Sequence, residues 1–191
     1  IKNIKEVNGR LQLIRTLSNQ AKIFIDYAHT PSALETSLKT LKEHYNIKPD
    51  VVFGCGGERD KKKRIIMAKV CEKYAEKIYI TDDNPRNENP KLIRQMIISG
   101  FKKREDVQNI PLRQKAITQA AINSKPNGII LVAGKGHETI QIYKNKTLNS
   151  SDKAIIKKIN IKLLKYSKNN YNQILNAELV YKLTKKKKHK V

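Results

Sequence analysis

Four short segments of this 191-residue chain combine charged side chains, amides and glycines in a way that suits the binding of a small ligand. Each directly follows an apolar run, and they comprise residues 26–31, 54–60, 82–86 and 134–138. Taken singly, each has an ordinary structural explanation, because glycines form turns and Asp or Thr residues cap helices. Together they favour a functional site. The charged residues that weigh most are Arg59, Asp60, Asp83, Arg86, Lys135 and Glu138.

This mixture of side chains suits a zwitterionic small molecule. A planar guanidinium group pairs with a carboxylate through two parallel hydrogen bonds, and the backbone amides of glycine-rich turns donate to the same oxygens. The carboxylate of Glu138, together with the amide oxygen of Asn84, would hold an ammonium group. We therefore expect a ligand that carries both carboxylate and ammonium groups.

The apolar runs before these segments predict the strands that must position them. Residues 22–26, 51–54, 77–81 and 128–133 are short and almost continuously apolar, which is typical of strands buried on both faces. Strands that alternate with helical stretches indicate crossover connections and a mostly parallel α/β sheet. Because ligands bind beyond the carboxyl ends of such strands, we expect the four segments to meet at one rim.

Four helices are predicted between these strands from their apolar stripes. The stripes are Leu34, Leu38 and Leu41, then Ile66, Val70 and Tyr74, then Leu92, Met96 and Ile97, and finally Ala116, Ile117, Ala120 and Ala121. Thr30 is expected to cap the first helix ahead of Pro31, since proline is favoured at the first helical position.

Weaker patterns predict the two ends of the domain. Residues 9–14 alternate weakly and would form a first strand, and residues 152–164 would form a last helix. Residues 141–148 indicate a C-terminal antiparallel hairpin that turns at residues 145–146.

Length and charge predict one domain over residues 1–165 and a basic tail over residues 166–191. The tail is expected to be disordered, because adjacent like charges repel and bury nothing. The net charge of +23 invites a nucleic-acid hypothesis, but residues 153–191 alone hold twelve lysines and one acidic residue. With no Trp and three Phe, the chain also offers few stacking groups, so we expect no nucleic-acid partner.

Cysteine usage and hydropathy set further expectations. Cys55 and Cys71 are too few for a disulfide framework and lie in no Cys/His cluster, so we expect a reducing cytoplasm and no metal site. No run of about 18 apolar residues occurs, so no membrane association is expected. The chain begins with Ile1, and we expect it to be a piece of a longer protein.

The four segments, in this order and at these separations, resemble the C-terminal domain of the Mur ligases, from about residue 9 to about residue 159. The Asp-Asn-Pro-Arg motif at residues 83–86 resembles the diaminopimelate-adding branch, MurE. The resemblance implies a Rossmann-like domain that binds the incoming amino acid and closes over a central ATP-binding domain. In the implied reaction of peptidoglycan synthesis, ATP activates the D-glutamyl carboxylate of UDP-MurNAc-L-Ala-D-Glu as an acyl phosphate, and the amine of meso-diaminopimelate attacks it.

The resemblance assigns five residues to diaminopimelate. Arg86 and Asn84, together with Arg59, would hold the distal carboxylate end, whereas Gly134 and Glu138 would face the distal amino end. Diaminopimelate has two carboxylates and two ammonium groups, which matches the mixture of charges in the four segments.

Asp26 and His29 correspond to family positions that face the nucleotide across the domain interface. No GxxxxGK[ST] phosphate loop occurs, so ATP and Mg²⁺ are expected to bind mainly to a central domain. We therefore expect no catalytic residue in this chain and no ligation by the chain alone. Residues 151–153 match the family's Ser-Asp-Arg except at the last position, and Lys62 replaces a glycine whose positive φ a lysine would adopt only at a cost.

Other functions were weighed against this one. Within the superfamily they are a lysine-adding MurE, MurF and folylpolyglutamate synthase; Arg86 argues against lysine, which has no distal carboxylate. In another class stands the basic nucleic-acid-binding module. A dinucleotide-binding domain is the weakest alternative, because residues 54–57 match GxGxxG poorly.

Overall fold

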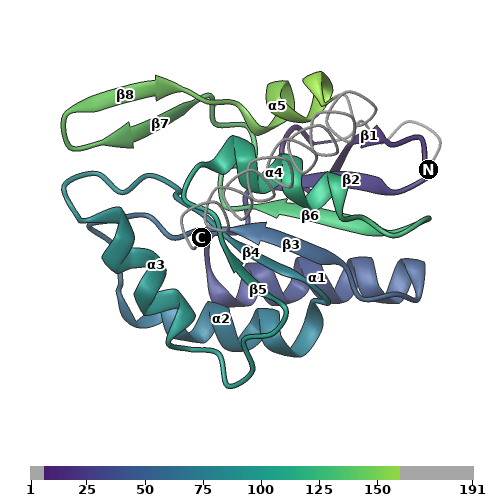
Figure 1. Ribbon diagram of the computed structural model, residues 1–191, viewed down its shortest axis with the longest axis horizontal. Coiled ribbons are helices and arrows are strands. Elements are labelled where there is room, and N and C mark those ends of the chain that lie inside the picture. Colours follow the sequence, from purple (N-terminus) through teal and green to yellow (C-terminus); the bar gives the residue numbers. More distant parts are fainter. Residues whose placement is uncertain (1–6, 160–191) are drawn as a thin grey trace, which may run out of the picture. The chain divides into compact units, whose positions relative to one another are not determined.

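The computed structural model describes residues 7–159, which build a central six-stranded sheet flanked by helices (Figure 1). The strands are β1 (Gln12–Thr16), β2 (Lys22–Asp26), β3 (Asp50–Phe53), β4 (Ile78–Ile80), β5 (Val107–Asn109), β6 (Ile129–Ala133), β7 (Ile140–Tyr143) and β8 (Lys146–Asn149). The helices are α1 (Pro31–Tyr45), α2 (Lys62–Tyr74), α3 (Pro90–Ile98), α4 (Arg113–Ile122) and α5 (Asp152–Lys158).

The sheet has the strand order β1-β2-β6-β3-β4-β5, and all its pairings are parallel except that of β1 with β2. Strands β7 and β8 form a separate antiparallel hairpin. These features confirm the predicted α/β class, the mostly parallel sheet and the C-terminal hairpin. The hairpin turns at residues 144–145, one residue earlier than predicted. Strand β5 was not predicted, because it is a three-residue edge strand of sequence Val-Gln-Asn without a buried residue.

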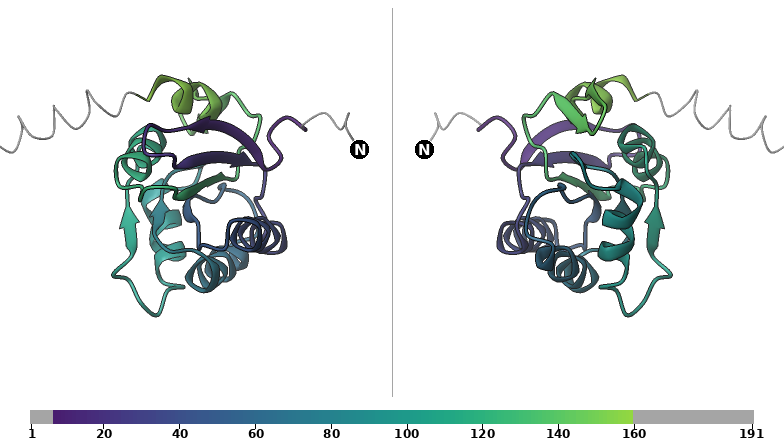
Figure 2. Two further views of the ribbon diagram at one scale, coloured as in Figure 1. Left: turned by 90° about the vertical axis from the view of Figure 1, so that its right-hand side faces the viewer. Right: turned by 90° about the vertical axis from the view of Figure 1, so that its left-hand side faces the viewer.

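Helices α1, α2 and α3 cover one face of the sheet, and α4 and α5 cover the other (Figures 1 and 2). Every residue of β3 and of β6 is buried, as expected for strands between two helical layers. The main apolar cluster lies between the sheet and α1 to α3, and its fully buried strand residues are Val51, Phe53, Ile80, Leu131 and Ala133.

The predicted apolar stripes are confirmed in α1 and α4 and only in part in α2 and α3. In α2 the predicted Tyr74 is buried together with Met67 and Cys71, whereas Ile66 is 49% exposed. In α3 the predicted Ile97 is buried, but its buried neighbour is Ile93, and Leu92 is 57% exposed. Both stripes include a buried arginine, and a charged residue on the inner face hid the true periodicity from a count of apolar residues.

The local backbone confirms the predicted helix cap at Thr30 and differs from the prediction at Lys62. The Thr30 hydroxyl accepts a hydrogen bond from the Ala33 amide at 3.3 Å, which confirms it as the cap of α1. The cost expected at Lys62 is absent, because that residue begins α2 with helical backbone. Left-handed backbone instead occurs at Glu58 (φ 56°) and Arg86 (φ 51°).

The described residues end shortly after α5. The predicted last helix is observed over Asp152–Lys158 and ends before Ile159, whose backbone is extended. Residues 160–164 of that prediction lie outside the described residues, as do the domain boundary at residue 165 and the tail at residues 166–191. Among the helices of residues 7–159, none has the length and apolar character needed to span a bilayer.

Candidate ligand-binding site

A cavity of about 520 Å³ opens at the carboxyl ends of β2, β3, β4 and β6. Its lining comes from all four segments singled out in the sequence, so the predicted rim is where the chain is hollowed. The lining residues that matter below are His29, Arg59, Asp83, Asn84, Arg86, Gly134 and Glu138. We call residues 54–61 the β3 loop and residues 81–89 the β4 loop.

Arg86 reaches the cavity from a constrained backbone in the β4 loop. Its amide donates to the Ile142 carbonyl at 3.0 Å, and its Nη1 donates to the Gly57 carbonyl at 2.9 Å. A Cβ at Gly57 would lie 1.9 Å from the Pro85 carbonyl oxygen, so only glycine allows this approach. All side-chain hydrogen bonds of Arg86 within residues 7–159 involve Nη1, which leaves its Nη2 and Nε for a ligand carboxylate.

Arg59 supplies a second guanidinium group from the β3 loop. Its side chain is exposed, and Nη1 donates to the Glu58 carbonyl at 3.2 Å. A Cβ built on Gly56 would lie 3.0 Å from Nη1 of Arg86 and 3.9 Å from Cγ of Arg59. The two arginines therefore flank the small surface of Gly56, and together they make this end of the cavity a place for a carboxylate.

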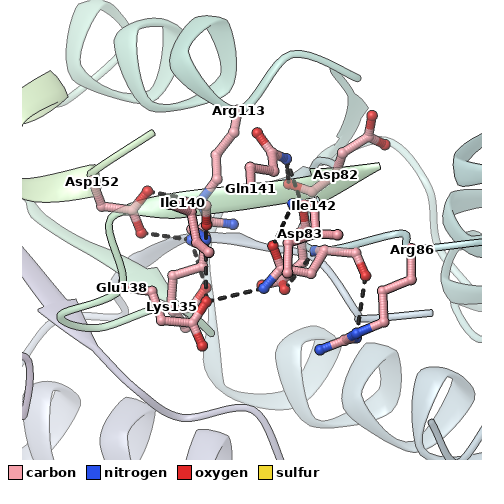
Figure 3. Close-up of polar contacts among 12 residues, drawn as sticks. Asp82, Asp83, Arg86, Arg113, Lys135, Glu138, Ile140, Gln141, Ile142 and Asp152 are labelled. Atoms are coloured by element: carbon pink, nitrogen blue, oxygen red, sulfur yellow. Dashed lines mark hydrogen bonds and ion pairs between the residues drawn. The ribbon is translucent and has the colours of Figure 1, made fainter. Parts of the chain in front are cut away.

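Asn84 and Glu138, two of the residues expected to bind the ligand, lie together, but the Asn84 amide oxygen that was expected to accept from an ammonium group accepts from a backbone amide instead. The Asn84 Nδ2 donates to Glu138 Oε2 at 3.0 Å, and the Asn84 Oδ1 accepts from the Ile142 amide at 3.0 Å (Figure 3). The fully buried Lys135 also reaches Glu138 Oε2, at 3.2 Å. No hydrogen bond within residues 7–159 uses Oε1 of Glu138, so this oxygen is available to an ammonium group.

Asp83 is a carboxylate of the cavity that the sequence placed on the rim but not among the ligand residues. It is 8% exposed, its Oδ1 accepts from the Asn84 amide at 2.7 Å, and its Oδ2 lies 2.9 Å from where a Cβ of Gly134 would stand. Burial raises the pKa of Asp83, and the nearby Arg113 and Lys135 oppose that rise. An Asp-Asn-Pro sequence resembles a simple turn; the signal that could have found Asp83 is its place two residues beyond a buried strand.

Gly134 contributes space rather than a side chain. Its φ of 110° lies in a region that favours glycine, and any Cβ would press against Asp83 Oδ2. Its amide donates to the Asp26 carbonyl at 3.1 Å, which fixes the start of the loop after β6. The residue therefore keeps the wall around the Asp83 carboxylate open.

Asp26 and His29, which were predicted to face a nucleotide, differ in accessibility. Both carboxylate oxygens of Asp26 accept backbone hydrogen bonds, from Leu11 at 2.6 Å and Ala28 at 2.7 Å, and Asp26 is only 6% exposed. His29 is exposed in the cavity lining, and its Nδ1 lies 2.9 Å from the Tyr27 carbonyl oxygen. Asp26 thus positions the loop, and the nucleotide assignment of both residues stays a prediction.

The β7–β8 hairpin backs the cavity by binding the β4 loop. The Gln141 Nε2 donates to the carbonyls of Asp82 and Asp83, at 3.1 and 2.6 Å (Figure 3). The Tyr143 hydroxyl donates to Asp82 Oδ2 at 3.1 Å. Together with the Ile142 contacts to Asn84, these bonds hold the β4 loop from the side opposite to the β3 loop.

Comparisons with known proteins show which family the chain belongs to. The family model for the Mur ligase glutamate ligase domain matches residues 9–136. UDP-N-acetylmuramoyl-L-alanyl-D-glutamate–2,6-diaminopimelate ligases from Buchnera aphidicola subsp. Acyrthosiphon pisum and Rickettsia montanensis are 49% and 50% identical over 150 and 158 residues. These matches cover 78% and 81% of this chain but 30% and 32% of the relatives, so the chain spans about a third of their length.

Solved structures give the same result. One structure of a ligase with that name superimposes with a TM-score of 0.72 and 35% identity, over 81% of this chain and 31% of that one. The folylpolyglutamate synthase/dihydrofolate synthase of Yersinia pestis shares the fold alone, at 16% identity and a TM-score of 0.53, over 68% of this chain and 28% of that one. The family and fold expected from the sequence are confirmed: this chain belongs to the Mur ligase family, through the glutamate ligase domain that it matches.

Proposed function

We propose that residues 7–159 form the amino-acid-binding domain of a ligase that adds meso-diaminopimelate to UDP-MurNAc-L-Ala-D-Glu in peptidoglycan synthesis. The observation that carries the proposal is that one cavity is lined by both positively and negatively charged side chains. Arg59 and Arg86 supply guanidinium groups, and Asp83 and Glu138 supply carboxylates. A molecule with a carboxylate and an ammonium group at its distal end complements both.

The carboxylate end is where diaminopimelate and lysine differ. The Arg86 guanidinium is held by the Gly57 carbonyl through Nη1, so its remaining edge is oriented before the ligand arrives. Lysine has no distal carboxylate and would leave two cations, those of Arg59 and Arg86, without a partner. This contrast supports diaminopimelate over the lysine-adding alternative.

The ammonium end would be held by two carboxylates, those of Glu138 and Asp83. Asn84 donates its amide hydrogens to Glu138 and thereby orients that carboxylate, while Oε1 of Glu138 and Oδ2 of Asp83 would accept from the ammonium group. The Gly134 backbone leaves the space between them open. In this proposal the described residues bind and orient the amino acid and carry out no proton transfer or bond formation.

The nucleotide belongs to the proposed reaction as well. Bound ATP with Mg²⁺ would supply the activation of the D-glutamyl carboxylate; the Yersinia pestis synthase that shares the fold is a complex with AMPPNP and a manganese ion. Of this chain's residues, the exposed His29 fits a position that faces a nucleotide, whereas the Asp26 carboxylate is occupied by backbone amides. A cytoplasmic location and the lack of nucleic-acid and membrane partners stay predictions.

Calorimetric titration with meso-diaminopimelate and with L-lysine tests the proposal, using the wild-type chain and Arg86→Lys. We expect the wild-type chain to bind diaminopimelate and to bind lysine more weakly. Arg86→Lys keeps the charge but loses the guanidinium fork, so the affinity for diaminopimelate should fall roughly tenfold or more.

Arg104→Lys, on the exposed loop before β5, is the matched control and should leave the affinity unchanged. Equal affinity of the wild-type chain for both amino acids would contradict the proposed selectivity. Equal affinity of Arg86→Lys and wild type would remove Arg86 from the binding site.

A further inference from the structure

An ion pair between a fully buried arginine and a half-buried glutamate outside the cavity joins both arginine-bearing loops. Arg64 lies on α2 and is fully buried, and its Nη2 is 2.9 Å from each carboxylate oxygen of Glu88 in the β4 loop. The same Nη2 donates to the carbonyl of Gly56 in the β3 loop, at 3.3 Å. One guanidinium group therefore contacts the loop that carries Arg59 and the loop that carries Arg86.

Further hydrogen bonds extend this junction. Glu88 Oε1 accepts from the Glu58 amide at 2.6 Å, and Asn87 Nδ2 donates to Glu58 Oε1 at 2.6 Å. The Gly57 amide donates to the Asn84 carbonyl at 2.9 Å. Because Glu88 Oε1 accepts from both Arg64 and the Glu58 amide, this carboxylate of the β4 loop is the common partner of helix α2 and the β3 loop.

The stability of the fold alone does not explain why Arg64 and Glu88 form an ion pair beneath the two loops. Arg64 is 0% exposed and its Nε has no hydrogen-bond partner within residues 7–159, so its burial carries an uncompensated cost. Apolar residues often replace a buried ion pair without loss of stability. What an apolar pair could not reproduce is the set of directed hydrogen bonds to Gly56 and Glu58.

We propose that Arg64 and Glu88 are positioning residues that set the spacing of the Arg59 and Arg86 guanidinium groups, and thereby the selection of an amino acid with a distal carboxylate. The inference rests on the proposed function, because it explains how the carboxylate end of that site is held. Neither residue lines the cavity, so both would act through the loops rather than on the ligand.

Amide hydrogen exchange of the 191-residue chain, followed by NMR, tests the positioning without any ligand. The variant is Glu88→Gln, which keeps the side-chain shape and removes the charge. We expect the exchange of the Glu58 amide, corrected for its intrinsic rate, to accelerate roughly ten- to a hundredfold, because its hydrogen bond to a charged acceptor is weakened. The neighbouring Gly57 amide, which donates to the β4 loop, should accelerate with it, because the junction of the two loops is loosened. The amides of β3 and β6 should keep their rates.

Two controls separate positioning from stability. Glu76→Gln breaks the exposed pair of Glu76 with Lys125 at the other end of the sheet and should leave the β3 loop unchanged. The double variant Arg64→Met with Glu88→Gln leaves no unpaired buried charge. We expect it to keep the thermal midpoint of the wild-type chain while Gly57 and Glu58 still exchange rapidly.

Titration of the same variants with meso-diaminopimelate and L-lysine tests the consequence. We expect the preference for diaminopimelate to fall roughly tenfold in Glu88→Gln, mainly through weaker binding of diaminopimelate. Unchanged loop exchange in Glu88→Gln overturns the inference, and so does faster exchange with unchanged preference. If the wild-type chain binds neither amino acid, the proposed function is what fails for the isolated chain, and loop exchange alone then decides on Arg64 and Glu88.

Discussion

Asp83 carries a carboxylate where burial works against its charge. Its pKa is raised above the usual 3.8 by burial, although Arg113 and Lys135 favour the ionised form. An ammonium group that entered the cavity would add a positive charge beside Oδ2 and favour ionisation further. At the scale of single residues, the site is thus arranged so that ligand binding and the protonation of one buried carboxylate are linked.

The affinity for diaminopimelate should therefore depend on pH. Only ionised Asp83 attracts an ammonium group, so affinity is expected to be lost as pH falls through the raised pKa, beginning above pH 3.8. Asp83→Asn should weaken binding at pH 7 roughly tenfold and flatten this profile. Calorimetric titrations between pH 4 and pH 8 measure both effects, with Asp106→Asn on the exposed loop before β5 as the control. A similar slope in Asp83→Asn and wild type would assign the dependence to another group.

Individual cavity residues were predictable because their types and their places after apolar runs both indicated function. Arg59, Asn84, Arg86, Gly134 and Glu138 all line the cavity. The residues beneath them were not predictable. Nothing in the sequence indicated that Arg64 and Glu88 support the site. The burial of an arginine on a helix, and its pairing with a glutamate in a distant loop, cannot be read from the neighbouring residues in the sequence.

At the scale of elements, helix α5 is joined to the rest of the domain by a buried ion pair. Arg113 at the start of α4 donates to both carboxylate oxygens of Asp152, through Nε at 2.8 Å and Nη2 at 2.7 Å, and Nη2 also donates to the Ala133 carbonyl (Figure 3). Burial alone would lower the pKa of Arg113, but the carboxylates of Asp152, Asp83 and Glu138 together offset it and the pKa is raised. The pair thus connects α4, α5 and the end of β6.

Asp152→Asn should destabilise the domain by about 3–5 kcal/mol, because it leaves the Arg113 charge buried without its partner. Urea unfolding at pH 7 measures the difference, and Asp106→Asn on an exposed loop serves as the control. Replacing Arg113 by Met in the Asp152→Asn background should recover much of the loss. A single variant as stable as wild type would show that water reaches the guanidinium group.

The elements themselves were predictable wherever one pattern dominated. The buried strands β2 and β6 and the stripes of α1 and α4 were found because their apolar residues are consecutive or regularly spaced. Strand β5 was missed because three residues at a sheet edge carry no periodicity. The inner face of α2 was misassigned because Ile66 is exposed while Arg64 is buried, which is the reverse of what hydropathy favours.

At the scale of the whole described domain, the proposed ligand-binding cavity and the buried carboxylate of Asp50 lie at opposite ends of the sheet. Asp50 begins β3, is 8% exposed and accepts a hydrogen bond from the Lys77 amide at 3.2 Å. It lines a hollow of about 180 Å³ with Glu76 and Lys125. Burial raises the pKa of Asp50 to about 6, and the amide and charge of Lys77 oppose the rise.

This pKa shift predicts that the domain loses stability as pH rises from about 4 to about 6. The pKa of Asp50 in the folded state lies above the usual aspartate value of 3.8, so the stability that Asp50 contributes is full below pH 3.8 and is lost as pH rises to about 6. Asp50→Asn should therefore be more stable than wild type at pH 7, by up to roughly 3 kcal/mol, and equal to it near pH 4. Urea unfolding at both pH values measures this, and a difference that persists unchanged at pH 4 would contradict it.

The contact between Gly57 and Pro85 has a consequence for how such a domain can change over evolutionary time. A Cβ at Gly57 would overlap the Pro85 carbonyl, and neither loop can shift away without displacing its own arginine. Substitutions at Gly57 are therefore not tolerated, whereas substitutions of side chains that point away from this contact are. New substrate preferences in this lineage would arise by replacing individual residues on a fixed frame rather than by re-spacing the loops.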